Sequence, residues 1–158
     1  MNFTTTNFNK IQLMLYLKDK QIDRAYYKTA AGTLELLFVD SLMYQAQFID
    51  ENYSDKNTAI FSENEITKLL LTGTPFQLKV WNALLQIPAG KITTYFDIAQ
   101  MIGHPRSWRA VANAIGSNPI AYFIPCHRVL RKAGGLCGYN WGIDKKRALL
   151  QVEGVSLV

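Results

Sequence analysis

Apolar and polar positions alternate through the first third of the chain with the two-residue period of β-strands. Three such runs cover residues 24–28, 33–39 and 42–48, and short turns at Ala30-Ala31-Gly32 and Asp40-Ser41 separate them. Runs of this length joined by tight turns are typical of an antiparallel meander. The pattern therefore predicts a small sheet in the N-terminal half.

The segments that flank this sheet are less regular. Residues 11–20 fit either a helix or a strand, and residues 51–58 are polar and predict a loop. Ser62 and Glu65 have the spacing of a capping box, which predicts a short helix through Leu71. Residues with evident chemistry are missing from this half, so we interpret it as structural.

Beyond residue 72 the apolar positions change to helical spacing. Thr74-Pro75-Phe76-Gln77 combines an N-cap, a proline at the first helical position and Gln at N3, and the apolar stripe that follows ends at Ile87-Pro88. A second helix is predicted from Thr94 through Ile102. A third begins at His104-Pro105 and runs to about Gly116.

Two short helices joined by a glycine-containing turn are typical of a helix-turn-helix, whose second helix usually contacts DNA. In the second helix of this pair, Trp108, Val111 and Ile115 form a stripe that we expect to be buried. The opposite face has small side chains interrupted by Arg109, so it could approach a groove of DNA closely. The same face could instead form a tight helix–helix contact.

The distribution of charge favours DNA. The net charge is +5, but residues 1–70 carry 7 basic and 9 acidic side chains, whereas residues 71–158 carry 10 and 3. Between residues 100 and 147 there are eight basic residues and one acid. Basic side chains that are concentrated in one segment bind the phosphates of nucleic acid whatever its base sequence.

Composition excludes several other classes of protein. The chain is 49% apolar, which excludes disorder for most of it, and it has no apolar run long enough to span a membrane. The polar N-terminus does not resemble a secretory signal, so we expect an intracellular, cytoplasmic protein. Two cysteines and two histidines make a metal site improbable, and we expect no metal.

A cysteine followed by a histidine is the strongest chemical signal. Residues 120–124 are apolar and predict a buried strand that leads to Cys126 and His127. Nearby positive charge could stabilise a Cys126 thiolate. Neighbouring side chains of a strand point to opposite faces, so His127 needs a turn or a bridging water to take the thiol proton. Cys137 lacks a nearby histidine, and we interpret it as a structural thiol.

A Cys-His pair alone is not specific, but it is one of a series of short motifs that extends over about 80 residues. They are Gly73-Thr74-Pro75-Phe76-Gln77, Val80-Trp81, Ile87-Pro88-Ala89-Gly90, Thr94-Tyr95, Arg109-Ala110-Val111, Asn118-Pro119, Pro125-Cys126-His127-Arg128-Val129, Gly138-Tyr139 and Glu153-Gly154. In their order and spacing these motifs resemble those of the O6-alkylguanine-DNA alkyltransferases, which repair DNA by direct reversal, and the stretch 138–142 is similar to bacterial members.

The resemblance implies a role for each residue of the reaction centre. Cys126 would accept the alkyl group, His127 would act as base through a water molecule, and Glu153 would orient the imidazole. Asn118 would be the hinge that holds the recognition helix against the active-site segment. The implied reaction is irreversible transfer of a methyl or small alkyl group from O6-alkylguanine, or O4-alkylthymine, to Cys126 in a single turnover. This implied chemistry needs no cofactor.

The resemblance also implies how DNA is bound. The base would be flipped out of a duplex approached from the minor groove, with Tyr95 rotating the 3′ phosphate and Arg109 filling the gap in the stack. The DNA-contacting residues implied are Tyr95, Arg109, Gln77, Phe96, His104, Ala110, Asn113 and Lys132. The residues implied to line the guanine pocket are Tyr139, Val129, Asn140 and Trp141. We expect a monomer in solution that can cluster on double-stranded DNA.

The implied fold is α+β. Residues 1–72 would form a ribonuclease-H-like structural subdomain, and residues 73–158 a helical subdomain with a winged-helix-like helix-turn-helix that binds DNA and accepts the alkyl group.

Three departures from the family pattern lead to further expectations. Trp108 stands where the family has a small residue, so it either packs inward with Val111 or alters the groove surface, and we expect inward packing. A Phe-x-Leu-Pro segment before Gly73 is missing, so the N-terminal part looks trimmed. Trp141 predicts poor acceptance of large benzylic adducts.

Two alternative functions stay open. One is a non-catalytic protein that binds alkylated bases and flags them for other repair, although such relatives replace the cysteine. The other is a cysteine hydrolase or redox protein, which the basic half and the missing C-x-x-C pattern disfavour.

Overall fold

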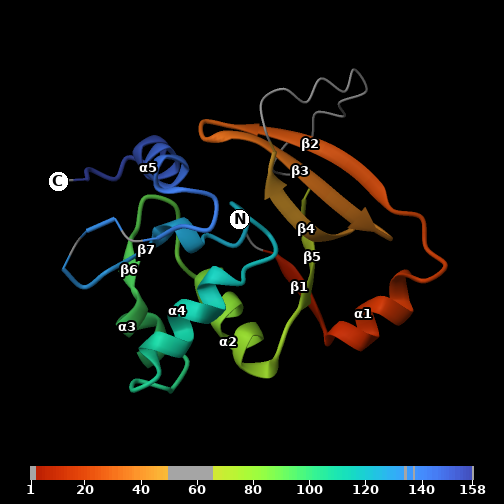
Figure 1. Cartoon of the computed structure of the whole chain (residues 1–158), viewed down its shortest axis with the longest axis horizontal. Coiled ribbons are helices and arrows are strands. Elements are labelled where there is room, and N and C mark those ends of the chain that lie inside the picture. The colour runs from red at the N-terminus through yellow and green to blue at the C-terminus, as the bar shows by residue number, and fades with distance from the viewer. Residues whose placement is uncertain (1–2, 50–65, 134, 137, 158) are drawn as a thin grey trace.

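A mixed five-stranded sheet and a group of short helices lie side by side in the computed structural model, which describes residues 3–49, 66–133, 135–136 and 138–157 (Figure 1). Helix α5 lies beside the helical group, and α1 lies at the opposite end of the molecule, next to β1. The elements in chain order are β1 (Thr4–Phe8), α1 (Lys10–Leu17), β2 (Asp23–Thr29), β3 (Gly32–Val39), β4 (Leu42–Phe48), β5 (Lys68–Thr72), α2 (Pro75–Leu84), β6 (Thr93–Thr94), α3 (Tyr95–Met101), α4 (Trp108–Gly116), the 3-10 turn η2 (Cys126–Arg128), β7 (Val129–Leu130) and α5 (Ile143–Val152).

The large sheet has the strand order β1-β5-β4-β3-β2. Strands β2, β3 and β4 pair antiparallel in sequence order, which confirms the predicted meander. Strand β5 then pairs parallel with both β4 and β1. The α+β class predicted from the sequence is confirmed. None of the helices formed by the described residues is long and apolar enough to cross a membrane.

The helix predicted through Leu71 is wrong, because residues 68–72 form β5. Leu69, Leu70 and Leu71 are all fully buried, as expected for a strand covered on both faces, and such a run lacks the polar face of a surface helix. Residues 62–65 of that prediction, and the loop predicted at 51–58, lie outside the described residues. The undecided segment 11–20 forms α1, which Asn9 and Gln12 begin with a capping box.

The two helix starts predicted in the basic half are confirmed. Thr74 caps α2 and Thr94 caps α3, each with a reciprocal capping box. The third helix begins later than predicted, at Trp108. Inward packing of Trp108 is wrong, since 44% of this side chain is exposed. Trp108 is the first residue of α4 and lies beyond its buried stripe of Val111, Ala114 and Ile115.

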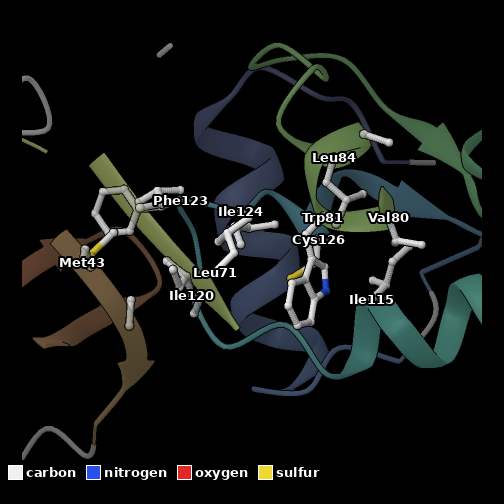
Figure 2. Close-up of a cluster of buried hydrophobic side chains, with 14 of the residues drawn as sticks. Met43, Leu71, Val80, Trp81, Leu84, Ile115, Ile120, Phe123, Ile124 and Cys126 are labelled. Carbon is white, nitrogen blue, oxygen red and sulfur yellow. The ribbon is translucent and has the colours of Figure 1, made fainter. Parts of the chain in front are cut away.

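One continuous core joins the sheet to the helices, and Cys126 belongs to it (Figure 2). Trp81 of α2 lies in this core and donates its Nε1 hydrogen to the carbonyl oxygen of Ala114 at 2.8 Å, which fixes α2 against α4. Met43 of β4 and Leu71 of β5 extend the same cluster into the sheet.

Segment 120–124 is buried as predicted, but it is not a strand. Ile120 makes a single parallel bridge with Ala46 of β4, and the chain then turns. The amide of Ala46 donates to the carbonyl of Pro119 at 3.1 Å, and the amide of Ala121 donates to the carbonyl of Ala46 at 2.9 Å. Tyr122 adopts a left-handed backbone with φ of 71°. The sheet, although it looks trimmed in sequence, therefore anchors the chain that leads to Cys126.

Candidate active site

Cys126 is the first residue of η2, and 4% of it is exposed. Strand β6, which comes directly before α3, pairs parallel with β7, which comes directly after η2. This pairing holds the start of α3 next to the cysteine. The buried amide of Asn118 donates to the Cys126 sulfur at 3.1 Å and to the carbonyl of Ile124 at 2.9 Å, while its oxygen accepts from the amide of Ile120.

The thiol of Cys126 is protonated at neutral pH. Burial raises its pKa from 9.0 to about 11, against the opposing effects of the Asn118 hydrogen bond, the Lys146 charge and the Tyr139 hydroxyl. The charge of Lys146 does favour the thiolate, as expected of a neighbouring cation, but the net shift of the pKa in the free protein is upward. The reason is that desolvation outweighs the cations, and Arg128 is paired with Glu153. A base has to remove the thiol proton before the sulfur can react.

His127 is a neutral imidazole with a defined tautomer. Its side chain is fully buried, and burial lowers its pKa although Glu153 works in the opposite direction. Nε2 lies 2.9 Å from a Glu153 carboxylate oxygen, which can only accept, so Nε2 carries the hydrogen. The other nitrogen, Nδ1, is buried and has no hydrogen-bond partner among the residues the structure describes. That nitrogen is the acceptor of the ring, as a general base requires.

Glu153 ties three separate segments together. Its carboxylate accepts from His127, from the Arg128 guanidinium at 2.7 and 3.0 Å, and from the amide of Gly90 at 3.3 Å. Burial alone would raise its pKa, but the hydrogen bonds and charges of His127 and Arg128 lower it from 4.5 to about 2. Gly90 has a φ of 76°, and a Cβ there would lie 2.9 Å from the backbone oxygen of Glu153. A larger residue would not fit at this contact.

Two adjoining hollows open beside the cysteine. They share Tyr95, Ala112 and Gly138. The smaller, of about 50 Å³, is lined by Tyr95, Ala112, Ile115, Gly116, Cys126, Gly138, Tyr139 and Asn140. The larger groove, of about 620 Å³, is lined by Tyr95, Phe96, Trp108, Ala112, Arg131, Lys132 and Gly138.

The structure therefore brings most of the predicted reaction centre together. Cys126, His127, Glu153 and Asn118 form one connected set, and two of the predicted pocket residues, Tyr139 and Asn140, line the small cavity. Val129 is fully buried in β7 and is not among the described residues that line either hollow.

Trp141 is also missing from the described lining of both hollows. Its ring lies edge-on to those of Tyr139, with centroids 5.3 Å apart, and Phe48 of β4, at 6.3 Å. It thus supports the pocket loop from the side of the sheet.

The residues predicted to contact DNA are divided between two places. Tyr95, Phe96 and Lys132 line the larger groove, and Arg109, Ala110 and Asn113 are exposed on α4. Gln77 and His104 are engaged elsewhere. The Gln77 side chain accepts from the amide of Thr74 in the α2 capping box, and the His104 ring lies edge-on to Phe76. Cys137 lies outside the described residues.

Lys146, Arg128 and Tyr122 were not among the predicted site residues, and the two basic ones entered the sequence reasoning only as positive charge near Cys126. Lys146 is 1% exposed and donates from Nζ to the carbonyl of Val129 at 2.6 Å. Lys146 lies three residues before Leu149 on the apolar stripe of α5, so its burial could have been predicted from the sequence. The bidentate contact of Arg128 with Glu153 joins residues 25 positions apart and left no local signal. Tyr122 stacks on His127, with centroids 6.2 Å apart, although they are only five positions apart in sequence, because the chain turns at Tyr122.

Within the described part of the chain, no three His, Cys, Asp or Glu residues gather in a way that could hold a metal ion. Cys126 is followed directly by His127, whose imidazole contacts the Glu153 carboxylate at 2.9 Å, so the site offers a thiol, an imidazole and a carboxylate close together. This is the arrangement of an activated thiol.

Comparison with known proteins identifies the family. The family model described as 6-O-methylguanine DNA methyltransferase, DNA binding domain, matches residues 75–155. A probable methylated-DNA–protein-cysteine methyltransferase of Acanthamoeba polyphaga mimivirus is 41% identical over 131 residues, 81% of this chain and 86% of the relative. The methylated-DNA–protein-cysteine methyltransferase of Mycobacterium tuberculosis is 54% identical over 86 residues, 54% of this chain and 52% of the relative.

A solved structure extends the match to the whole fold. The crystal structure of Mycobacterium tuberculosis OGT in complex with DNA has a TM-score of 0.67 and 36% identity, and the match covers 82% of this chain and 92% of that one. The chain belongs to the methylated-DNA–protein-cysteine methyltransferase family.

Proposed function

We propose that this protein repairs O6-alkylguanine in duplex DNA by transferring a methyl or small alkyl group to the sulfur of Cys126. The observation that carries the proposal is the neighbouring thiol, neutral imidazole and ionised carboxylate of Cys126, His127 and Glu153, of which the thiol and the imidazole are buried. Membership of the methyltransferase family supports it. O4-alkylthymine is a second substrate of the same chemistry.

The reaction proceeds by displacement at the alkyl carbon. The thiol proton passes through a bridging water to Nδ1 of His127, while Glu153 holds the hydrogen on Nε2. The sulfur attacks the alkyl carbon, a carbon–sulfur bond forms, and the bond from that carbon to O6 breaks with its electron pair left on guanine. A hydrogen bond from Tyr95 eases the departure of the base. The thioether cannot be hydrolysed, so each molecule acts once and needs no cofactor.

The target base has to leave the duplex for this reaction. Cys126 is 4% exposed at the floor of a cavity of about 50 Å³, and a base paired inside the helix cannot present its alkyl carbon to it. Tyr95 rotates the 3′ phosphate and Arg109 occupies the gap. The position of Tyr95, at the start of α3 and on the wall of both hollows, supports this role.

The DNA-binding surface is the face of α3 and α4, used as a helix-turn-helix against the minor groove. Exposed Arg109, with Arg131 and Lys132 in the groove, supplies the charge. The related Mycobacterium tuberculosis protein has been crystallised with DNA, which supports this partner.

We further propose that residues 1–72 form a structural part and that residues 73–158 form the part that binds DNA and accepts the alkyl group. We also propose that the protein is a monomer that can cluster on DNA, and that it is located in the cytoplasm.

The test is the intact mass of the protein after incubation with a duplex that contains one O6-methylguanine. The proposal expects a gain of one methyl group, located on Cys126 by peptide mapping and lost in Cys126→Ser. Lesion-specific binding without a mass change would refute transfer and favour a protein that flags lesions for other repair. Neither binding nor transfer would favour a cysteine hydrolase or redox protein.

A further inference from the structure

Two aromatic side chains on the walls of the larger groove are each paired with a cation. The Arg109 guanidinium lies 4.8 Å from the ring centroid of Trp108, and the Lys132 ammonium lies 5.3 Å from that of Phe96. Trp108 is 44% exposed and Phe96 is 37% exposed. The groove therefore offers flat apolar rings framed by positive charge.

Packing in the protein core does not explain the presence of a tryptophan at position 108. The buried stripe of α4 consists of Val111, Ala114 and Ile115, and Trp108 precedes it at the start of the helix. Leaving an indole this exposed keeps a large apolar area in contact with water. The position of the ring, on a groove next to the reactive thiol, points to a ligand with a flat face.

We propose that this groove is a second base-binding subsite, in which Trp108 stacks on a nucleobase that loses its neighbour when the damaged nucleotide is extruded toward Cys126. The inference rests on the proposed function, because it requires an opened duplex. It assigns to Trp108 a direct DNA contact that is additional to the insertion of Arg109.

Position and charge select a nucleobase as the occupant. The groove shares Tyr95, Ala112 and Gly138 with the cavity above Cys126, so a strand that delivers one base to the cavity runs past the groove. Arg131 and Lys132 on its wall complement the phosphates of that strand. Aromatic rings between cations are the usual platform for unpaired bases, and stacking on them tolerates any sequence.

Duplex affinity is the first measurement. We expect Trp108→Ala to raise the Kd for an O6-methylguanine duplex about tenfold, within the range of stacking on one base. Trp108→Phe keeps a stacking ring and should stay within about threefold of the wild type. Leu15→Ala is the matched control, because Leu15 is 70% exposed on α1, far from α4 (Figure 1), and its loss should leave the Kd unchanged.

Tryptophan fluorescence is the second measurement. Of the other two tryptophans, Trp81 is buried and hydrogen-bonded to Ala114, so a stacking base cannot reach its ring. Trp141 is present in both the wild type and Trp108→Phe, so its contribution is common to the two proteins. We expect the lesion duplex to quench the wild-type protein strongly and Trp108→Phe much less, at concentrations where both are fully bound.

The Arg109→Ala background distinguishes direct stacking of Trp108 on a base from an indirect effect in which Trp108 only holds the Arg109 side chain in place. If Trp108 contacts a base itself, the roughly tenfold loss caused by Trp108→Ala persists in the Arg109→Ala background. A loss that disappears there, an unchanged Kd in Trp108→Ala, or equal quenching in Trp108→Phe would each overturn the inference. In these three cases methyl transfer to Cys126 still proceeds and the proposed function stands, whereas a wild-type protein that neither binds nor repairs the duplex refutes both.

Discussion

Replacing Glu153 with glutamine tests the electrostatic link that holds the reaction centre together. The substitution keeps the shape of the side chain but removes the charge that Arg128 and His127 contact at 2.7 and 2.9 Å. Both partners are largely or fully buried, with side-chain exposures of 14% and 0%. Arg128 would then keep a mostly buried charge without its counterion.

The magnitude follows from the pKa of the carboxyl group. A group whose pKa falls from 4.5 to about 2 on folding stabilises the folded state by about 3 kcal/mol at neutral pH. Removing one partner of a buried ion pair costs about 3 to 5 kcal/mol in other proteins, which is consistent. We expect Glu153→Gln to lower the free energy of unfolding by about 3 kcal/mol at pH 7.

The dependence on pH has a defined sign. The unfolded chain takes up a proton at Glu153 near pH 4.5, whereas the folded chain does so only near pH 2. This contribution is therefore complete above about pH 5 and is lost progressively as the pH falls toward 2. The stability advantage of the wild type over Glu153→Gln should shrink across that window, and the difference cancels the titration of all other carboxyl groups.

Urea unfolding followed by circular dichroism at pH 7, 5, 4 and 3 measures this difference. Asp144→Asn is the matched control, because Asp144 pairs with Arg147 on α5 but 98% of its side chain is exposed. Its neutralisation should change stability by less than about 0.5 kcal/mol. A gap between wild type and Glu153→Gln that stays constant from pH 7 to 3 would refute the reasoning, as would equal stabilities at pH 7.

Three further predictions concern the reaction centre. Asn118→Ala removes the hydrogen bonds to Cys126, Ile124 and Ile120, so we expect a stability loss of about 2 kcal/mol in urea unfolding and single-turnover transfer slowed about tenfold. Because burial lowers the pKa of His127 below 6.5 and its neutral form is the base, the transfer rate should fall only below about pH 6.5, and a fall that begins above pH 7.5 would contradict this assignment. Trp141→Ala should speed the reaction of Cys126 with O6-benzylguanine more than with methylated DNA, measured by intact mass, and unchanged benzyl transfer would show that Trp141 does not limit the pocket.

Local chemistry made the helix starts and the meander predictable. The capping boxes at Thr74 and Thr94 provide hydrogen-bond acceptors for amide groups within one helical turn, so four consecutive residues are enough to predict each helix start. Strand β5 was missed because its apolar run fits a buried strand or helix equally well. Residues 68–72 form a strand because they pair with β1 and β4, and the residues of those strands are distant in sequence.

The site was predictable to a different degree. Cys126 and His127 stand next to each other and could be proposed from residue chemistry, but the link to Glu153 came from family resemblance. Spacing alone could not place a carboxylate 26 residues later beside the imidazole. The position of Trp108 was missed because periodicity does not say where a helix begins, and the first residue of α4 lies outside its buried stripe.

The buried thiol has a consequence for how the reaction is controlled. With a pKa of about 11, forming the Cys126 thiolate costs about 5 kcal/mol at pH 7. Burial is the largest cause of that cost, and the same burial keeps dissolved electrophiles away from the sulfur. In the proposed reaction, proton transfer to His127 has to offset this cost while an alkyl carbon is bound, because the Cys126 thiol stays protonated in the free protein. Under the proposed function, reactivity is therefore coupled to delivery of a base into the small cavity, so that a nucleophile proposed to act once is not consumed before it meets damaged DNA.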